Sequence, residues 1–131
     1  MSLLLDTHVL LWAAAQADRL SPEVRARLED PAEAPVFSAA SLWEIAIKAA
    51  LGRPDFRVDG ARLRAGCLAA GYVELPITGL HALEAGQLPA LHRDPFDRML
   101  VAQARAEAMT LMTADAEVLA YGGDIVDVRQ S

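Results

Sequence analysis

Short apolar runs alternate with longer stretches in which apolar and polar residues repeat with a helical period. Because the apolar runs are brief and bounded by turn residues or acids, they predict short buried strands. The predicted strands are residues 2–5, 36–37, 72–75, 110–112 and 124–128.

The stretches between these runs predict helices. The clearest spans residues 40–51, where Leu42, Ile45 and Ala49 lie on one apolar stripe and Gly52 ends the helix. The others are predicted at residues 8–15, 23–28 after Ser21 and Pro22, 63–70 up to Gly71, 78–85 between a Thr78 cap and a terminating Gly86, 94–108 and 115–120.

Strands that alternate with helices predict a parallel sheet covered by helices on both faces. We therefore expect a three-layer α/β/α sandwich with a short central parallel sheet. The length of 131 residues suits one domain, and no repeat or low-complexity tract divides it. A single domain over residues 1–131 is predicted.

Four acidic residues lie where this topology gathers ligand groups, beyond the carboxyl ends of the strands. Asp6 follows the first predicted strand, and Asp115 follows the fourth. Glu44 lies in the first turn of the helix after the second strand, and Asp97 in the first turn of the long helix before the fourth. Carboxylates sharing one edge repel one another, and hard divalent cations offset that repulsion. The pattern predicts a Mg²⁺ or Mn²⁺ site.

Each acid also has a purely structural interpretation. Residues 41–44 (Ser-Leu-Trp-Glu) match a capping box with Glu44 at the third helical position, and residues 94–97 (Asp-Pro-Phe-Asp) match an acidic N-cap followed by proline. Asp6 and Asp115 could each cap the helix that follows. For any one residue, capping is the favoured interpretation; the combination of four favours a metal site.

Composition narrows the classes of function. The net charge of −6 argues against a nucleic-acid binder unless the acids surround cations, in which case an RNA substrate is compatible. The single cysteine, Cys67, and the absence of an apolar leader or membrane-length run predict a cytoplasmic protein. An apolar content of 53% exceeds what a small globule normally buries, which favours a partner chain.

Other α/β enzymes fit the pattern less well. No glycine-rich turn follows the first strand, which disfavours a dinucleotide enzyme. A phosphoacceptor receiver domain needs a lysine after a late strand, and the only lysine is Lys48. An aspartate-nucleophile phosphatase needs an acid two residues after Asp6, where His8 stands. One cysteine and three scattered histidines do not match zinc spacing, and we assign the histidines no chemistry.

Four segments resemble, in order, the motifs of PIN domains. They are residues 3–8 (Leu-Leu-Leu-Asp-Thr-His), 38–45 (Ser-Ala-Ala-Ser-Leu-Trp-Glu-Ile), 97–104 (Asp-Arg-Met-Leu-Val-Ala-Gln-Ala) and 111–115 (Leu-Met-Thr-Ala-Asp). The resemblance covers essentially the whole chain. It implies the PIN fold and a divalent-metal ribonuclease that hydrolyses RNA phosphodiester bonds.

Carried over by position, the resemblance assigns the catalytic and metal-holding set to Asp6, Glu44, Asp97 and Asp115. Of these, Asp6 and Asp97 are expected to be direct ligands of the cation. The supporting residues are Thr7, Thr113 and Asp94, of which the first two would hydrogen-bond to carboxylates or water and the third is preferred as a helix cap.

Within the family, the chain most resembles the toxin subunits of VapBC-type toxin–antitoxin pairs. This implies a homodimer and a small antitoxin that blocks the active site. Basic residues that could contact RNA phosphates are Lys48, Arg53, Arg57, Arg93 and Arg98, although Lys48 could instead pair with Glu44. Trp12 and Trp43 could stack on bases, but packing is the favoured interpretation. The alternative function is a non-catalytic PIN-fold interaction module.

Overall fold

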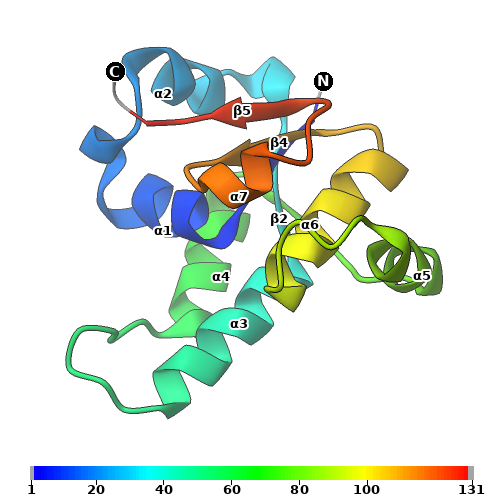
Figure 1. Cartoon of the computed structure of the whole chain (residues 1–131). Coiled ribbons are helices and arrows are strands. Elements are labelled where there is room, and N and C mark those ends of the chain that lie inside the picture. The colour runs from blue at the N-terminus through cyan, green and yellow to red at the C-terminus, as the bar shows by residue number, and fades with distance from the viewer. Residues whose placement is uncertain (1, 130–131) are drawn as a thin grey trace.

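A computed structural model describes residues 2–129 as a five-stranded parallel sheet between layers of helices (Figure 1). The strand order is β3-β2-β1-β4-β5, and each neighbouring pair is parallel. The strands are β1 (Leu3–Leu5), β2 (Pro35–Ser38), β3 (Val73–Leu75), β4 (Thr110–Thr113) and β5 (Ile125–Asp127). The predicted three-layer α/β/α architecture is confirmed.

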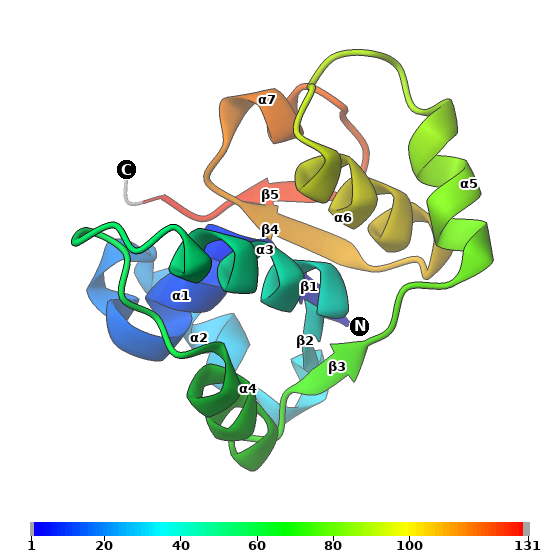
Figure 2. The same ribbon diagram turned by 90° about the horizontal axis from the view of Figure 1, so that it is seen from below.

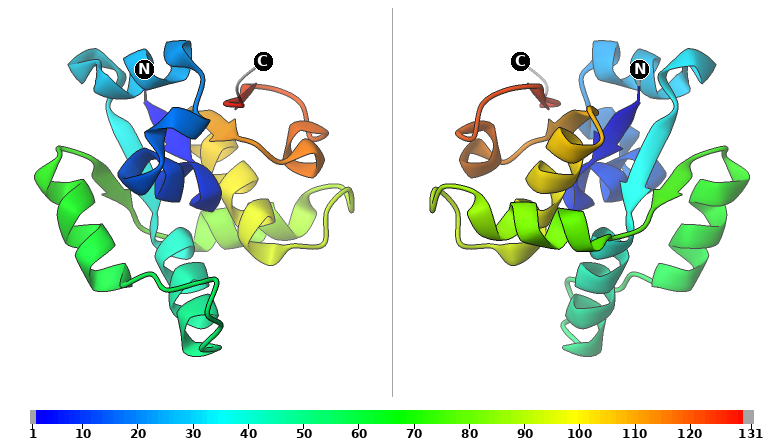
Figure 3. Two further views of the ribbon diagram at one scale, coloured as in Figure 1. Left: turned by 90° about the vertical axis from the view of Figure 1, so that its left-hand side faces the viewer. Right: turned by 90° about the vertical axis from the view of Figure 1, so that its right-hand side faces the viewer.

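Helices cover both faces of this sheet (Figure 3). They are α1 (Thr7–Ala15), α2 (Pro22–Glu29), α3 (Ala39–Ala50), α4 (Gly60–Ala69), α5 (Gly79–Gln87), α6 (Pro95–Ala106) and α7 (Ala116–Leu119), with 3-10 turns η1 (Ala17–Arg19) and η2 (Pro31–Glu33). α3 extends from the carboxyl end of β2 and contacts both α1 and α6 (Figure 2). No helix within residues 2–129 is long and apolar enough to cross a bilayer.

The core has two halves because successive strand residues point to opposite faces. Leu3 and Leu5 of β1 pack with Val9 of α1 on one face. Leu4 packs with Leu100 of α6 on the other face. All five side chains are at most 1% exposed, so the middle strand is buried on both sides.

The start of α3 differs from the sequence prediction. The N-cap is Ser38, whose hydroxyl accepts from the backbone N–H of Ala40, so the capping box at residues 41–44 is wrong. Ser41 lies inside the helix and is buried, and Glu44 is in the second turn rather than the first. The difference arises because β2 passes directly into α3, with its last residue also serving as the cap.

Of the other predicted helix ends, two N-caps are confirmed and one C-terminal glycine is not. Ser21 and Thr78 cap α2 and α5 as expected, and the side chain of His81 completes a capping box at α5. Gly86 does not terminate α5, which continues to Gln87. Gly86 does not adopt a positive φ, so α5 continues through it. Gly71, by contrast, has a φ of +92° and follows the end of α4, as the sequence predicted.

Candidate metal centre

The four predicted acids all lie beyond the carboxyl edge of the sheet. Asp6 is the N-cap of α1 directly after β1, and Asp115 is the N-cap of α7 two residues after β4. Glu44 comes from α3 and Asp97 from the first turn of α6. The helices carrying them meet at this edge, where α3 contacts both α1 and α6 (Figure 2).

Asp6 is 3% exposed and joins the ends of two strands. One of its oxygens accepts from the backbone N–H of Val9 at 2.8 Å, and the other accepts from the Thr113 hydroxyl. Burial raises the pKa of Asp6, and the charge of Asp115 adds to that rise, while the two hydrogen bonds oppose it. Asp6 thus caps α1, as the sequence suggested, and also joins α1 to the end of β4.

Glu44 is buried beside the first turn of α1. Its Oε1 accepts from the Thr7 hydroxyl at 2.6 Å, and its Oε2 lies 2.9 Å from Nζ of Lys48. The Thr7 hydroxyl is also 3.0 Å from that of Ser41. These contacts direct the Glu44 carboxylate toward α1. Glu44 therefore does not take part in the capping box that the sequence predicted at the start of α3.

Asp97 lies among several other charged side chains. Its side chain is 15% exposed, and its Oδ2 lies 2.8 Å from Nε2 of His92. Burial raises the pKa of Asp97 to about 6; the charges of Asp94, Asp6 and Glu44 add to the rise, and the His92 hydrogen bond opposes it. Three other carboxylates thus act on Asp97, which places these acids in one electrostatic cluster.

Asp94 combines two features. Its Oδ1 accepts from the backbone N–H groups of Phe96 and Asp97 at 2.8 and 3.3 Å, so it caps α6 as the sequence predicts. In addition, ligand atoms of His92, Asp94 and Asp97 lie within 4.8 Å of one another. Two of these three donors are carboxylate oxygens, which Mg²⁺ and Mn²⁺ prefer.

His92 is the residue of this site that sequence reasoning missed. Its Nε2 is also 3.7 Å from Asp115 Oδ2, and its Nδ1 is 2.5 Å from Glu117 Oε2. Partial burial lowers the pKa of His92, but the hydrogen bond and charge of Asp97, with the charges of Glu117 and Asp115, raise it overall. A loop residue has no periodicity, and its only sequence signal is that it stands two residues before Asp94.

The basic residues proposed as phosphate contacts have different surroundings. Lys48 pairs with Glu44, the alternative that the sequence left open. Arg93 is exposed and lines a recess of about 360 Å³ together with Glu44 and Lys48. Arg53 is exposed in a separate recess beyond α3, which also contains Arg57.

Arg98 has a structural role. Its Nη2 donates to the carbonyl oxygens of Ala85 and Leu88 at 2.9 and 3.1 Å, and its Nη1 donates to those of Pro89 and His92 at 3.0 and 3.4 Å. These bonds tie the loop between α5 and α6 to the start of α6. A phosphate contact would have to compete with them.

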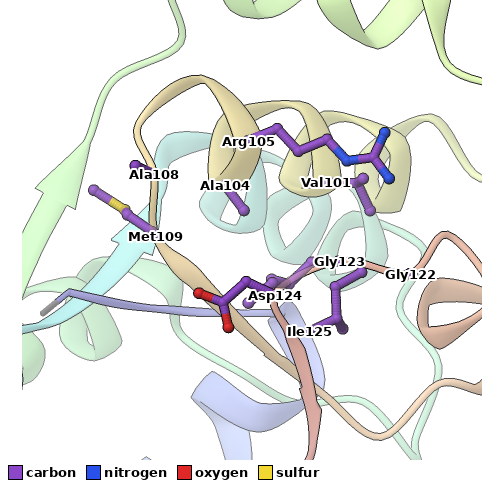
Figure 4. Close-up of a pocket in the computed structure, with 10 residues that line it drawn as sticks. Val101, Ala104, Arg105, Ala108, Met109, Gly122, Gly123, Asp124 and Ile125 are labelled. Atoms are coloured by element: carbon purple, nitrogen blue, oxygen red, sulfur yellow. The ribbon is translucent and has the colours of Figure 1, made fainter.

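A further pocket lies away from the acids, between α6 and the turn that leads into β5 (Figure 4). It has a volume of about 440 Å³, and its walls are mostly apolar, with Val101, Ala104 and Ile125 among them. Its two charged residues are engaged, Arg105 with the carbonyl of Tyr121 and Asp124 with the hydroxyl of Thr110. None of the four predicted acids lines this pocket.

The chain is similar to VapBC2 from Rickettsia felis bound to a DNA fragment from its promoter, with a TM-score of 0.72 and 14% identity over 98% of this chain and 99% of the other. It is also similar to VapBC-1 from nontypeable Haemophilus influenzae, with a TM-score of 0.68 and 18% identity over 97% and 98% of the two chains.

A third similar structure is a toxin–antitoxin complex from Klebsiella pneumoniae, with a TM-score of 0.66 and 16% identity over 94% of each chain. At such identities these structures show the shared fold. No curated protein matches the chain. The family profile of the PIN domain matches residues 3–123, which include all four predicted acids. This chain therefore belongs to the PIN domain family.

Proposed function

We propose that this protein is a divalent-metal-dependent endoribonuclease that hydrolyses RNA phosphodiester bonds. The observation that carries the proposal is the acidic cluster around Asp97, which offers a ligand atom within 4.8 Å of those of Asp94 and His92. Burial, followed by the charges of Asp94, Asp6 and Glu44, raises the pKa of Asp97 to about 6. Such a cluster destabilises the fold at neutral pH unless a cation offsets the repulsion, so its presence favours a functional role.

Asp6 and Asp97 would bind the Mg²⁺ or Mn²⁺ ion directly, and Glu44 and Asp115 would complete the cluster or orient water. The bound ion would supply an activated water and neutralise charge on the phosphate. Thr113 holds Asp6 by hydrogen bonding, and Thr7 likewise holds Glu44. Attack by water would leave a 5′-phosphate and a 3′-hydroxyl.

Arg93 and Lys48 are the basic residues best placed to contact the RNA backbone, because they line a recess that also contains Glu44. Arg53 would extend this contact along α3. Arg98 is assigned instead to the loop that it holds. These basic side chains would attract RNA phosphates locally in spite of the net charge of −6.

We also propose that the protein is the toxin of a type II toxin–antitoxin pair and acts in the cytoplasm as a homodimer bound by a small antitoxin. Two of the structures above are called VapBC and a third a toxin–antitoxin complex. An apolar surface on α3 supports a protein partner: Trp43, Ile47 and Leu51 are 62%, 42% and 58% exposed.

The activity is tested with purified protein and a labelled RNA in Mg²⁺ or Mn²⁺. We expect cleavage that a chelator abolishes and that D6N and D97N each lower at least 100-fold. D55N, a matched removal of an exposed carboxylate, should cleave like the wild type. Cleavage by D97N at the parental rate would refute the assignment.

The alternative, a non-catalytic interaction module, makes a different prediction. It expects no carboxylate-dependent metal binding, which a calorimetric titration with Mn²⁺ measures directly. Binding by the wild type that is lost in D97N favours the nuclease.

A further inference from the structure

The loop between α5 and α6 brings a histidine ring into the acidic cluster. The side chain of His92 is 12% exposed, with Nε2 at 2.8 Å from Asp97 Oδ2 and 3.7 Å from Asp115 Oδ2. Its Nε2 thus lies beside two of the carboxylates that the proposed function assigns to the cation.

These separations suit donors that share one ion. Around an octahedral ion with bonds of about 2.1 Å, neighbouring donor atoms lie about 3 Å apart. The 2.8 Å distance from His92 to Asp97 is close to that value, and the 3.7 Å distance to Asp115 is slightly longer. Asp94 also offers a carboxylate oxygen within 4.8 Å of the ligand atoms of both His92 and Asp97.

The other ring nitrogen has the partner that a metal-bound histidine usually has. Histidine ligands commonly donate one ring N–H to a carboxylate, which fixes the tautomer and directs the lone pair of the other nitrogen at the metal. Here Nδ1 of His92 is 2.5 Å from Glu117 Oε2, so Nε2 is the nitrogen left to face Asp97 and Asp115.

Hydrogen bonds hold the backbone of the loop at His92, which fixes the position of the imidazole ring. The His92 N–H donates to the Tyr121 hydroxyl at 3.2 Å, and the His92 carbonyl accepts from Arg98 at 3.4 Å. The Tyr121 hydroxyl in turn donates to the Pro89 carbonyl at 3.2 Å. A ligand held by its own loop in this way is preorganised.

We propose that His92 is a direct ligand, through Nε2, of a cation held by Asp94 and Asp97, and that Glu117 positions its ring. The proposal rests on the metal site of the proposed function. Imidazole nitrogen suits transition metals, whereas Mg²⁺ selects oxygen donors and retains its waters. A nitrogen donor at this site would therefore raise the affinity for Mn²⁺ more than the affinity for Mg²⁺.

The direct test is pulsed electron paramagnetic resonance of the wild-type protein loaded with Mn²⁺. A ¹⁴N coupling typical of a coordinated imidazole is expected in the wild type and absent in H92Q. His8 provides the matched control, because it is exposed and its charge acts on Asp6 across the same site. The coupling should persist in H8Q.

Calorimetry supplies the affinity. We expect H92Q to weaken Mn²⁺ binding about 10- to 100-fold and to change Mg²⁺ binding less, while E117Q weakens Mn²⁺ binding by a smaller factor. Tighter Mn²⁺ binding by H92Q would overturn the proposal, since His92 would then be a counter-ion that competes with the metal.

Failure of this proposal and failure of the proposed function give different results. Mn²⁺ that binds the wild type and depends on Asp97, but shows no ¹⁴N coupling, overturns the role of His92 alone. Mn²⁺ binding that is unchanged in D97N overturns the metal site itself.

Discussion

The raised pKa of Asp97 predicts that the ionised carboxylate of this residue destabilises the metal-free protein. In the folded chain this pKa is about 6, compared with an ordinary value of 3.8. Each pKa unit corresponds to about 1.4 kcal/mol, so ionised Asp97 lowers the free energy of unfolding by about 3 kcal/mol at neutral pH. The side chain is 15% exposed, so solvent screens little of this effect.

The substitution D97N removes the charge but leaves an oxygen that can accept from His92. At pH 7.5 with a chelator present, we expect D97N to be about 2–3 kcal/mol more stable than the wild type and to melt about 10 °C higher. The folded wild type binds the Asp97 proton more tightly than the unfolded chain does. Its stability therefore falls as the pH rises from about 4 to about 7, and the advantage of D97N disappears near pH 4.

Thermal melts from pH 4 to pH 8 check this prediction, with D55N as the control of equal charge change at an exposed position. Adding Mn²⁺ at about 1,000 times the wild-type dissociation constant should reverse the order, since binding then adds about 4.1 kcal/mol to the wild type that D97N lacks. If metal-free D97N melted at or below the wild-type temperature at pH 7.5, the reasoning from the burial of Asp97 and its repulsion by nearby carboxylates would be refuted.

Four further predictions follow from the same contacts. R98Q should lower the free energy of unfolding by about 2 kcal/mol in urea titrations, because Arg98 donates to several carbonyls of the α5–α6 loop. An unchanged urea midpoint would show that these hydrogen bonds do not stabilise the loop. S38A should cost about 2–3 kcal/mol by thermal melting, since the buried Ser38 hydroxyl donates to Gln103 at 2.6 Å and caps α3; a smaller loss than that of an exposed serine substitution would contradict this. I47K should convert a dimer to a monomer in analytical ultracentrifugation if the apolar surface of α3 is the homodimer contact, and an intact dimer would exclude that surface. Mn²⁺ affinity should fall as the pH drops below about 6, where protons compete for Asp97, and equal affinity at pH 5 and pH 7.5 would contradict metal binding there.

The sequence by itself determined the architecture, because local physics decides it. Apolar runs such as Leu3–Leu5, which end at an acid or a turn residue, favour strands buried on both faces, and the alternation with helices then favours a parallel sheet. Caps such as Ser21, Thr78 and Asp94 depend on residues two or three positions away and were predictable for that reason. The position of Asp6 and Asp115 at one edge of the sheet was also predictable, because parallel strands have their carboxyl ends at the same edge.

Only the tertiary structure decided how the side chains at that edge are engaged. Thr113 reaches Asp6 across 107 positions, and Thr7 reaches Glu44 across 37. No local rule specifies such pairings. Competition between two local rules also had to be resolved by packing, as when Ser38 rather than Ser41 became the cap of α3.

His92 shows the limit most clearly. Its loop carries no period and no turn motif, and its ring contacts Asp97 on α6 and Glu117 on α7 only because the chain folds. Arg98 has a strong positive charge that suggested a phosphate contact, yet carbonyl groups near it in space take its donors. A sequence determines which elements form, because their periods are local; which partner each polar group finds depends on the distances that packing creates.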